Sequence, residues 1–300
     1  MPELDDDKGI VDDHPWIIRI RHGCLEGMTK NILILGGTGT TGRRIARRLA
    51  AQGLAVRTAA RTGADVRLDL DDPTTWAPAL DGVTAAYLLE PAGQSRTPRL
   101  VEAAVAAGVK RLVLLSAHGV DHADDSHPLR AAEAAVRGSG VDWTVLQPEW
   151  FAQNFSESFW REGVRSGTLT LPTGDGRVPF VDAEDIADVA VAALTEDGHS
   201  GRTYRLTGPR SLSLGEAADV ITAATGREVR HLDIAPEDFI AQLVAHGTPE
   251  VVAGVLTGLL VNIRDGHAAD VSDGVEQALG RPARSFESFA AAAAAAGIWD

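Results

Sequence analysis

The sequence predicts an α/β protein with a doubly wound parallel sheet and a smaller, mainly helical C-terminal lobe. From Asn31 onward, short apolar runs alternate with amphipathic helical stretches, which is typical of parallel strands joined by crossover helices. After Pro148 this alternation loosens and helical patterns dominate. A chain of 300 residues, 44% of them hydrophobic, can bury about 75% of its unfolded surface, so one large unit with an appended lobe is expected.

The first 27 residues differ from the rest of the chain. They start with an acidic run, and the two methionines are Met1 and Met28, the second of which stands just before the first strand. We expect residues 1–27 to be a disordered leader, or to precede a working start at Met28. A short added strand or a partner-binding arm is the alternative.

Six apolar runs predict the strands that form the body of the sheet. These runs are Asn31–Leu35, Ala55–Ala60, Val66–Leu70, Ala85–Leu89, Arg111–Ser116 and Trp143–Gln147. The amphipathic stretches between them predict helices at Thr41–Gln52, Thr97–Ala107 and Leu129–Ser139. We therefore expect residues 28–150 to form the core of the sheet.

Residues 151–300 are expected to complete the sheet and to add the lobe, as one interleaved structural unit. The predicted elements are helices at Phe151–Gly163 and Asp182–Thr195, a strand at Thr203–Leu206 that rejoins the sheet, a strand near Val229–Ile234, and a terminal helix in the alanine-rich run Phe289–Ala296. The rest of the chain after Leu212 has a mainly helical pattern.

Charge and cysteine content argue against several kinds of partner. A net charge of −14 and a pI near 5.0 would repel phosphate backbones and anionic lipids, so neither nucleic acid nor a membrane is expected as a partner. No apolar run reaches the roughly 18 residues of a membrane span, and the acidic start does not resemble a signal peptide. Cys24 is the only cysteine, which excludes an intramolecular disulfide. Because this fits a reducing compartment, we expect a cytoplasmic protein.

A glycine turn follows the first strand directly and leads into an amphipathic helix. Gly36 permits a tight turn, Gly39 leaves room for a pyrophosphate, and Gly42 lets the helix pack closely on the strand. The amides at the start of the helix would then face the phosphates. We therefore expect a bound dinucleotide, with a purely structural turn as the alternative. The residues of the turn expected to contact it are Gly36, Thr38, Gly39, Thr40, Thr41 and Gly42.

Arg61 stands at the end of the second strand, beside the expected adenosine ribose. A guanidinium there can bind a 2′-phosphate through paired hydrogen bonds, whereas a carboxylate would bind a 2′-hydroxyl, so NADP(H) is favoured over NAD(H). The alternative is a solvated arginine, with Arg43 or Arg44 contacting the phosphate. Asp69, near the end of the third strand, is expected either on the adenine side of the site or as a helix cap.

Several further segments carry a family resemblance. They are Leu112-Val-Leu-Leu-Ser-Ala-His-Gly119, Ser139-Gly-Val-Asp-Trp-Thr-Val-Leu-Gln-Pro-Glu-Trp-Phe151 with Asn154 close behind, and Pro179-Phe-Val-Asp-Ala-Glu-Asp-Ile-Ala187. With the glycine turn, they make the chain after Met28 resemble NmrA-like atypical short-chain dehydrogenase/reductases. Within that group the chain is most similar to bacterial versions of the ergot-alkaloid-biosynthesis branch, the festuclavine dehydrogenase type. Many families share the glycine turn, whereas the last two segments are more specific.

The resemblance implies a Rossmann fold, bound NADP(H), and a substrate cleft between the sheet edge and the C-terminal lobe. By position, the residues implied at the nicotinamide end are Leu89, Glu90, Pro91, Ser116, Ala117, Pro148, Trp150 and Phe151. The residues implied in the substrate pocket are Trp150, Phe151 and Asn154. Relatives often carry arginine before the proline, where this chain has Gln147, which weakens the expectation of a charge there.

The usual proton donor of short-chain reductases is missing. That donor is a tyrosine made more acidic by a lysine four residues later. The tyrosines of this chain are Tyr87 and Tyr204, and its lysines are Lys8, Lys30 and Lys110. Either the protein is not a carbonyl reductase of the usual kind, or the proton comes from another group or from water.

His127 and Ser116 are the candidate catalytic residues. His127 lies 11 residues beyond Ser116, near the place expected for the tyrosine, and an imidazole titrates close to neutral pH. Ser116, at a strand end, would hydrogen-bond the same substrate atom. His118 is a further candidate, and the alternative for His127 is a solvated residue beside a helix.

Asp182 and Asp185 are interpreted as the cap and first-turn charge of a helix, and not as paired catalytic carboxylates. No histidine or cysteine cluster has the spacing of metal ligands, so no metal is expected.

These features favour an NADPH-dependent oxidoreductase that transfers hydride to a small conjugated acceptor, an imine, iminium or quinone. Such acceptors need less help from an acid than a ketone does, because an iminium already carries a positive charge. The alternative is a non-catalytic, redox-sensing regulatory protein of the NmrA type that binds NADP(H), and a third is a structural protein that has lost the site. A small-molecule substrate and a monomer or homodimer are expected.

Overall fold

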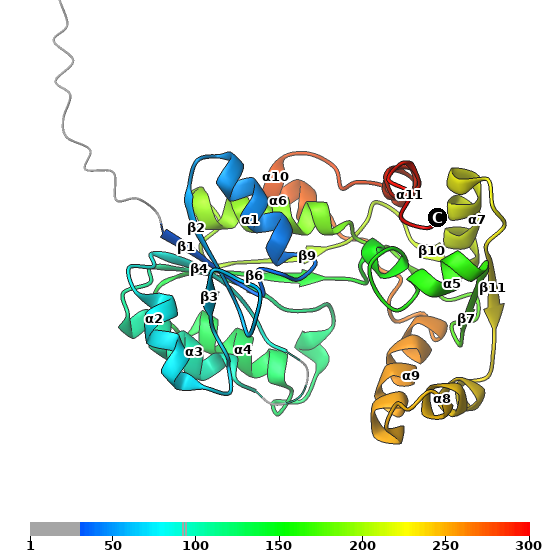
Figure 1. Ribbon diagram of the computed structural model, residues 1–300, viewed down its shortest axis with the longest axis horizontal. Coiled ribbons are helices and arrows are strands. Elements are labelled where there is room, and N and C mark those ends of the chain that lie inside the picture. The colour runs from blue at the N-terminus through cyan, green and yellow to red at the C-terminus, as the bar shows by residue number, and fades with distance from the viewer. Residues whose placement is uncertain (1–30, 92, 94) are drawn as a thin grey trace, which may run out of the picture.

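The computed structural model describes residues 31–91, 93 and 95–300 (Figure 1). The expected leader, residues 1–27, lies outside the described residues.

Seven parallel strands form the central sheet, in the order β3-β2-β1-β4-β5-β6-β9. The strands are β1 (Asn31–Leu35), β2 (Ala55–Ala60), β3 (Val66–Arg67), β4 (Ala85–Leu89), β5 (Arg111–Leu115), β6 (Asp142–Pro148) and β9 (Arg202–Leu206). The reversal of strand order at β1 and β4 is that of a doubly wound sheet, so the predicted fold class is confirmed. The strand predicted at Thr203–Leu206 does rejoin the sheet, where it pairs with β6.

Helices cover both faces of the sheet (Figure 1). One face carries α1 (Gly42–Ala51), α6 (Ala183–Thr195) and α10 (Gly274–Leu279), and the other carries α2 (Trp76–Leu80), α3 (Thr97–Ala106) and α4 (Pro128–Arg137). Side chains alternate along β1, so Ile32 and Ile34 pack with Ile186 of α6, whereas Leu33 packs with Leu100 of α3. The sheet is therefore buried on both sides, which explains its nearly continuous apolar strands.

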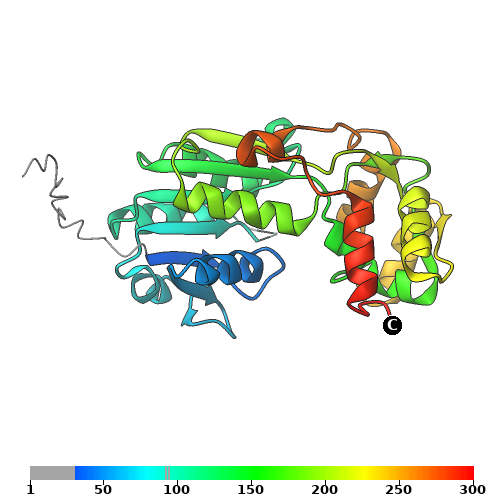
Figure 2. The same ribbon diagram turned by 90° about the horizontal axis from the view of Figure 1, so that it is seen from above.

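The second lobe lies beyond the carboxyl ends of the strands (Figure 2). It consists of α5 (Arg161–Ser166), β7 (Thr168–Leu171), β8 (Arg177–Val178), β10 (Leu212–Ser213), α7 (Leu214–Thr225), β11 (Arg230–Asp233), α8 (Pro236–Ala245), α9 (Glu250–Arg264) and α11 (Phe286–Ala295). Its core is aromatic, with Phe155, Phe180 and Phe286 in edge or tilted contact and Trp299 buried beside them. Residues 151–300 thus build this lobe and also supply β9, α6 and α10 to the sheet.

Two predicted elements differ from the structure. The helix predicted over Phe151–Gly163 is wrong: a short 3-10 turn, Ala152–Phe155, is followed by a bend and then by α5. The bend buries Trp160, which is 5% exposed and packs on Phe155, and it leaves Phe159 68% exposed. The strand predicted over Val66–Leu70 ends at Arg67, because a turn closed by the Asp69 to Asp72 bridge follows it.

Candidate active site

The glycine turn between β1 and α1 is built without room for side chains. Gly36 adopts a left-handed φ of +70°, and a Cβ atom on it would lie 2.6 Å from Leu89 Cδ2. A Cβ atom on Gly42 would lie 2.2 Å from the Gly36 carbonyl oxygen. Gly36 is therefore required by its backbone conformation, and Gly42 by the close approach of the start of α1 to the turn.

The amides of this turn are available to an anion. Among the described residues, no protein group accepts a hydrogen bond from the amides of Thr38, Thr40 or Thr41. They stand just before the first residue of α1, where the positive end of the helix dipole favours a phosphate. Free amides and absent β-carbons together fit the diphosphate of a dinucleotide.

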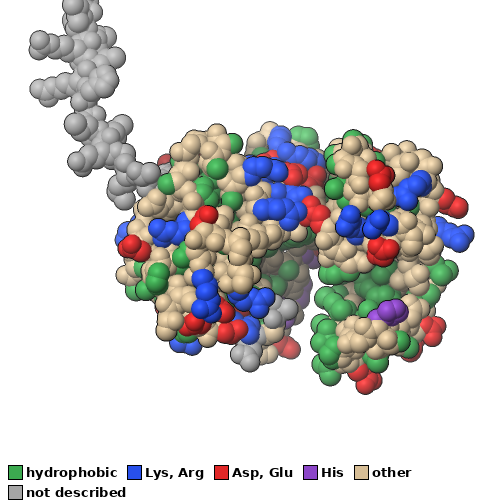
Figure 3. All heavy atoms as spheres, in the orientation of Figure 1, with side chains coloured by type: hydrophobic (Ala, Val, Ile, Leu, Met, Phe, Trp, Pro, Cys, Tyr) green, Lys and Arg blue, Asp and Glu red, His purple; other side chains and the backbone are tan. Residues whose placement is uncertain are grey.

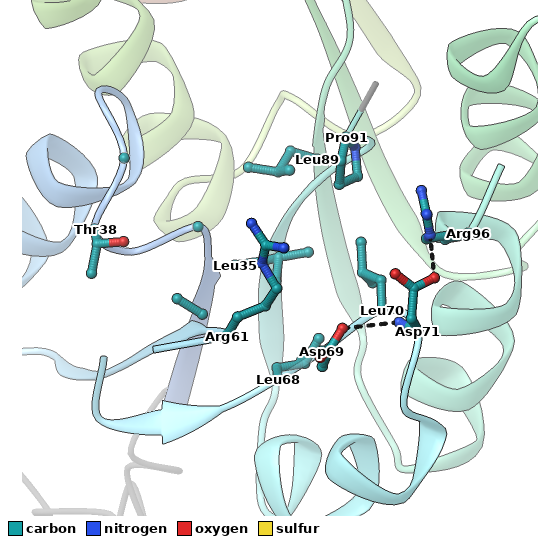
Figure 4. Close-up of a pocket in the computed structure, with 13 residues that line it drawn as sticks. Leu35, Thr38, Arg61, Leu68, Asp69, Leu70, Asp71, Leu89, Pro91 and Arg96 are labelled. Carbon is teal, nitrogen blue, oxygen red and sulfur yellow. Dashed lines mark hydrogen bonds and ion pairs between the residues drawn. The ribbon is translucent and has the colours of Figure 1, made fainter. Parts of the chain in front are cut away.

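A cavity of about 450 Å³ opens between the turn and the ends of β2 and β3 (Figure 4). The predicted contact residues that line it are Gly36, Thr38, Gly39, Arg61, Asp69, Leu89 and Pro91. The lining residues that sequence reasoning missed are Leu35, Ala60, Leu68, Leu70, Asp71 and Arg96. Most of the missed residues stand next to a predicted residue at the end of a strand. Their position at these strand ends could have identified them.

Arg61 extends into this cavity from the end of β2 (Figure 4). In the described part of the chain no carboxylate pairs with its guanidinium. The two alternative phosphate contacts are engaged elsewhere: Arg43 and Arg44 both bind Glu157, and Arg44 also binds Glu184 at 2.6 Å. Arg61 is thus better placed than either to meet an added phosphate group.

Asp69 also lines the cavity, and it does not cap a helix. Its Oδ1 accepts a hydrogen bond from the Asp71 amide at 3.1 Å (Figure 4), and Asp72 caps the next 3-10 turn by accepting from the Thr74 amide. The helix-cap alternative for Asp69 is therefore wrong, and its place on the adenine side of a bound dinucleotide stays a prediction.

Three predicted contacts are held by the protein itself. Glu90 Oε2 accepts hydrogen bonds from the amides of Arg96 and Thr97, at 3.0 and 2.7 Å, at the start of α3. Thr40 Oγ1 donates to Glu157, and Thr41 Oγ1 accepts from the buried Tyr87 hydroxyl at 2.9 Å. Burial raises the pKa of Tyr87, so this tyrosine does not ionise near neutral pH.

A second cavity, of about 640 Å³, lies beyond the ends of β5, β6 and β9 and under α9. Figure 3 shows the corresponding groove between the two lobes, with hydrophobic side chains gathered on the α8–α9 side. Its lining includes His118, Glu149, Trp150, Arg205, Leu259 and His267. The resemblance implies a substrate cleft in this place, between the sheet edge and the lobe.

The aromatic segment after β6 is only partly directed into the second cavity. Trp150 lines it and stacks on Trp160, with ring centroids 5.2 Å apart. Phe151 forms a bridge with Val181, and the carbonyl of Asn154 accepts the Trp160 amide. Phe151 and Asn154 line neither cavity, and the same holds for Ala117 and Pro148, whose carbonyl accepts the His118 amide.

The two predicted catalytic residues lie apart from both cavities. Ser116 is buried, and its hydroxyl donates to Glu133 Oε1 at 2.5 Å. Gln147 Nε2 and Arg137 Nη2 contact the carboxylate of the same Glu133, at 2.9 and 2.8 Å. Because Arg137 already neutralises this carboxylate, position 147 needs no second cation. His127 is exposed just before α4, and its side chain does not cap that helix.

Asp182 and Asp185, at the start of α6, have structural roles. Asp182 caps the helix by accepting from the Glu184 amide at 2.9 Å, as predicted. Asp185 is fully buried and forms ion pairs with Arg281 and Arg284. Among the described residues, no group of three potential ligands could hold a metal ion, and none of the helices has the length and apolarity to cross a membrane.

Glu149 is a buried polar residue of the second cavity that sequence reasoning missed. It is 7% exposed, its Oε2 has no hydrogen-bond partner, and this atom lies 3.7 Å from His118 Nε2. Burial raises the pKa of Glu149 to about 7. Its place directly after a parallel strand was a signal that could have found it.

The profile of a protein family described as NAD(P)H-binding matches residues 36–197, more than half of the chain. The chain belongs to this NAD(P)H-binding family. It is 36% identical to the NAD(P)H azoreductase of Xenophilus azovorans over 88% of this chain and 98% of that protein. It is 30% identical to festuclavine dehydrogenase of Aspergillus fumigatus, over 86% and 96% of the two chains.

Solved structures show the same NAD(P)H-binding fold. The NADPH-dependent quinone oxidoreductase of Escherichia coli, complexed with NADPH, superposes with a TM-score of 0.70 at 25% identity and covers 87% of this chain and 99% of its own. NmrA, a negative transcriptional regulator in complex with NAD, superposes with a TM-score of 0.68 at 16% identity, covering 88% and 95%. The latter likeness shows the fold alone.

These comparisons confirm the predicted NAD(P)H-binding family and an NAD(P)H-dependent oxidoreductase. The festuclavine-type relatives are fungal, where the sequence resemblance pointed to a bacterial branch.

Proposed function

We propose that this protein is an NADPH-dependent reductase that transfers hydride to a small conjugated acceptor, an imine, iminium or quinone. The observation that carries the proposal is the presence of two cavities along the carboxyl edge of one parallel sheet. One reaches from the glycine turn to Arg61, and the other lies past β5 and β6 under α9. A dinucleotide bound across such an edge extends from the first toward the second.

NADPH is preferred over NADH because of Arg61. Its guanidinium lines the first cavity and, among the described residues, forms no ion pair with a carboxylate, so it can bind the 2′-phosphate. The name of the Escherichia coli relative, an NADPH-dependent quinone oxidoreductase, supports this choice.

A flat, conjugated acceptor that also carries polar atoms fits the second cavity. Trp150 and Leu259 provide apolar walls, and most of the other lining side chains, among them His118 and Glu149, are polar. The names azoreductase, quinone oxidoreductase and festuclavine dehydrogenase support conjugated acceptors. A bacterial counterpart of the festuclavine type, acting on an iminium, is the finer form of this proposal.

When bound, NADPH supplies the hydride. The residues of this chain hold and orient the coenzyme and the acceptor. The turn amides bind the diphosphate and Arg61 binds the 2′-phosphate. Trp150 and Leu259 exclude water from the acceptor.

The test is oxidation of NADPH by the purified protein with a panel of quinones, imines and iminium ions. We expect turnover on at least one class, and a lower kcat/KM with NADH. Tight NADPH binding without turnover on any class would contradict the proposal and favour the redox-sensing regulator. That rival requires a protein partner whose affinity differs between the NADP⁺-bound and NADPH-bound forms.

A further inference from the structure

Glu149 is a buried carboxylate that receives little hydrogen bonding from the described part of the protein. Two buried side-chain oxygens in the described ranges lack a hydrogen-bond partner, Glu90 Oε1 and Glu149 Oε2. Two backbone amides hold the other oxygen of Glu90 at 3.0 and 2.7 Å, whereas Glu149 receives one long contact, 3.3 Å from the Trp150 amide. Glu149 therefore presents an unsatisfied carboxyl oxygen in the wall of the second cavity.

We propose that Glu149 is the catalytic acid of this cavity and gives the acceptor the proton that accompanies hydride transfer. This inference rests on the proposed function. As the hydride forms a bond to carbon, the π electrons of the C=O or C=N bond move to the heteroatom, and the proton leaves Glu149 to form an O–H or N–H bond. NADPH is oxidised to NADP⁺, the acceptor is reduced, and the Glu149 carboxylate regains a proton from water.

The surroundings of Glu149 favour its protonated form up to a pH of about 7. Burial raises its pKa, and the nearby Arg205 of β9 opposes that shift only in part. Nε and Nη2 of Arg205 are directed at the ring of His118, at 3.2 and 3.0 Å from Nδ1, rather than at Glu149. Burial and Arg205 lower the pKa of His118, so the ring beside Glu149 is neutral and does not act as its counterion.

The other ionisable side chains around the cavity are Asp121 and His122 from the segment after β5, and His267 and Asp270 from the segment after α9. Arg205 is the charged neighbour that opposes the effect of burial on Glu149.

Glu149 also has the position that the two predicted acids lack. His127 is exposed and lines neither cavity, and the Ser116 hydroxyl is bound to Glu133. Glu149 follows β6 directly, at the edge where ligands of doubly wound sheets bind, and it shares the cavity with Trp150.

The test compares Glu149→Gln with the wild type at saturating NADPH, using a quinone as acceptor, between pH about 5 and about 9. The wild-type kcat is expected to fall as pH rises through the Glu149 pKa of about 7. Glu149→Gln is expected to lose about 100-fold in kcat and to lose this pH step, with an unchanged Kd for NADPH. The control Glu102→Gln, at an exposed position of α3, should keep both rate and profile.

A second acceptor separates proton donation from a merely structural effect. An N-alkylated iminium ion accepts hydride without a proton, so on this acceptor Glu149→Gln should keep a kcat within about threefold of wild type below pH about 7. Equal losses on both acceptors, or a wild-type pH profile in Glu149→Gln with the quinone, would overturn the inference while leaving the reductase in place. A wild type that oxidises no NADPH overturns the proposed function, and this inference with it.

Discussion

Arg61 is the single side chain on which the choice between NADPH and NADH depends. Charge-assisted hydrogen bonds to a phosphate contribute about 1.5–3 kcal/mol, so Arg61→Ala is expected to raise the KM for NADPH roughly 10- to 100-fold. The KM for NADH should change little. Steady-state kinetics with both nucleotides provide the measurement.

Arg47→Ala is the matched control for Arg61→Ala. Arg47 is an exposed residue of α1, and its 3.4 Å ion pair is with Glu184 of α6. An equal loss with both nucleotides in Arg61→Ala would show that Arg61 does not bind the 2′-phosphate.

Glu149 also makes the stability of the protein depend on pH. Its pKa is raised from 4.5 to about 7 on folding, so between these values the native state holds a proton that the unfolded state has lost. Its contribution is therefore greatest below pH about 4.5 and is lost as pH rises to about 7, by on the order of 3 kcal/mol.

Glu149→Gln removes this dependence. Relative to wild type, the free energy of unfolding of the variant should increase as pH rises from about 4.5 to about 8, as measured by denaturant titration at several pH values. A difference between the two proteins that stays constant with pH would contradict the raised pKa.

At the scale of single residues, the sequence predicts the nucleotide half of the site better than the acceptor half. Gly36, Arg61 and Asp69 follow the first three strands within a short stretch of chain, and all three line the first cavity. The acidity of Glu149 depends instead on burial by distant elements and on Arg205 from β9. No local pattern reveals such an environment.

The glycine turn and the start of α1 act together as one element. In Gly42→Ala the new Cβ would meet the Gly36 carbonyl oxygen at 2.2 Å, so the helix must move and the turn amides lose their arrangement. We expect the Kd for NADPH to rise at least about 10-fold, because several amide contacts depend on that arrangement. Isothermal titration calorimetry would measure this change.

Gly254→Ala provides the control for this substitution. Gly254 lies within α9, and a Cβ atom there would have no neighbour within 4 Å. This variant should bind NADPH as the wild type does; an unchanged Kd in Gly42→Ala would show that the close approach is not needed.

Elements were predictable where one period dominates. The predicted bounds of β1, β2 and β4 agree with the structure because these strands are mainly apolar runs between clear breaks. The segment after β6 has aromatic residues at helical spacing, yet the burial of Trp160 against Trp150 and Phe155 bends the chain. Tertiary packing determines the conformation of that segment, and the local sequence pattern carries no information about this packing.

The whole molecule should unfold as one unit, since β9, α6 and α10 come from the same half of the chain as the lobe. Removing them would expose the edge of β6 and the apolar face that α6 covers. We expect a single thermal transition by both circular dichroism and tryptophan fluorescence, shifted upward by NADPH. Two separate transitions would show that sheet and lobe fold independently.

The two cavities draw on different stretches of the chain. Residues between Leu35 and Arg96 line the first, and residues between His118 and Asp270 line the second, including several from α9 and the segment after it. Changes around Leu259, Asn262 and His267 can thus alter which compound is reduced and leave nucleotide affinity intact. Because of this division, natural or directed evolution can change the electron acceptor while the coenzyme site stays the same.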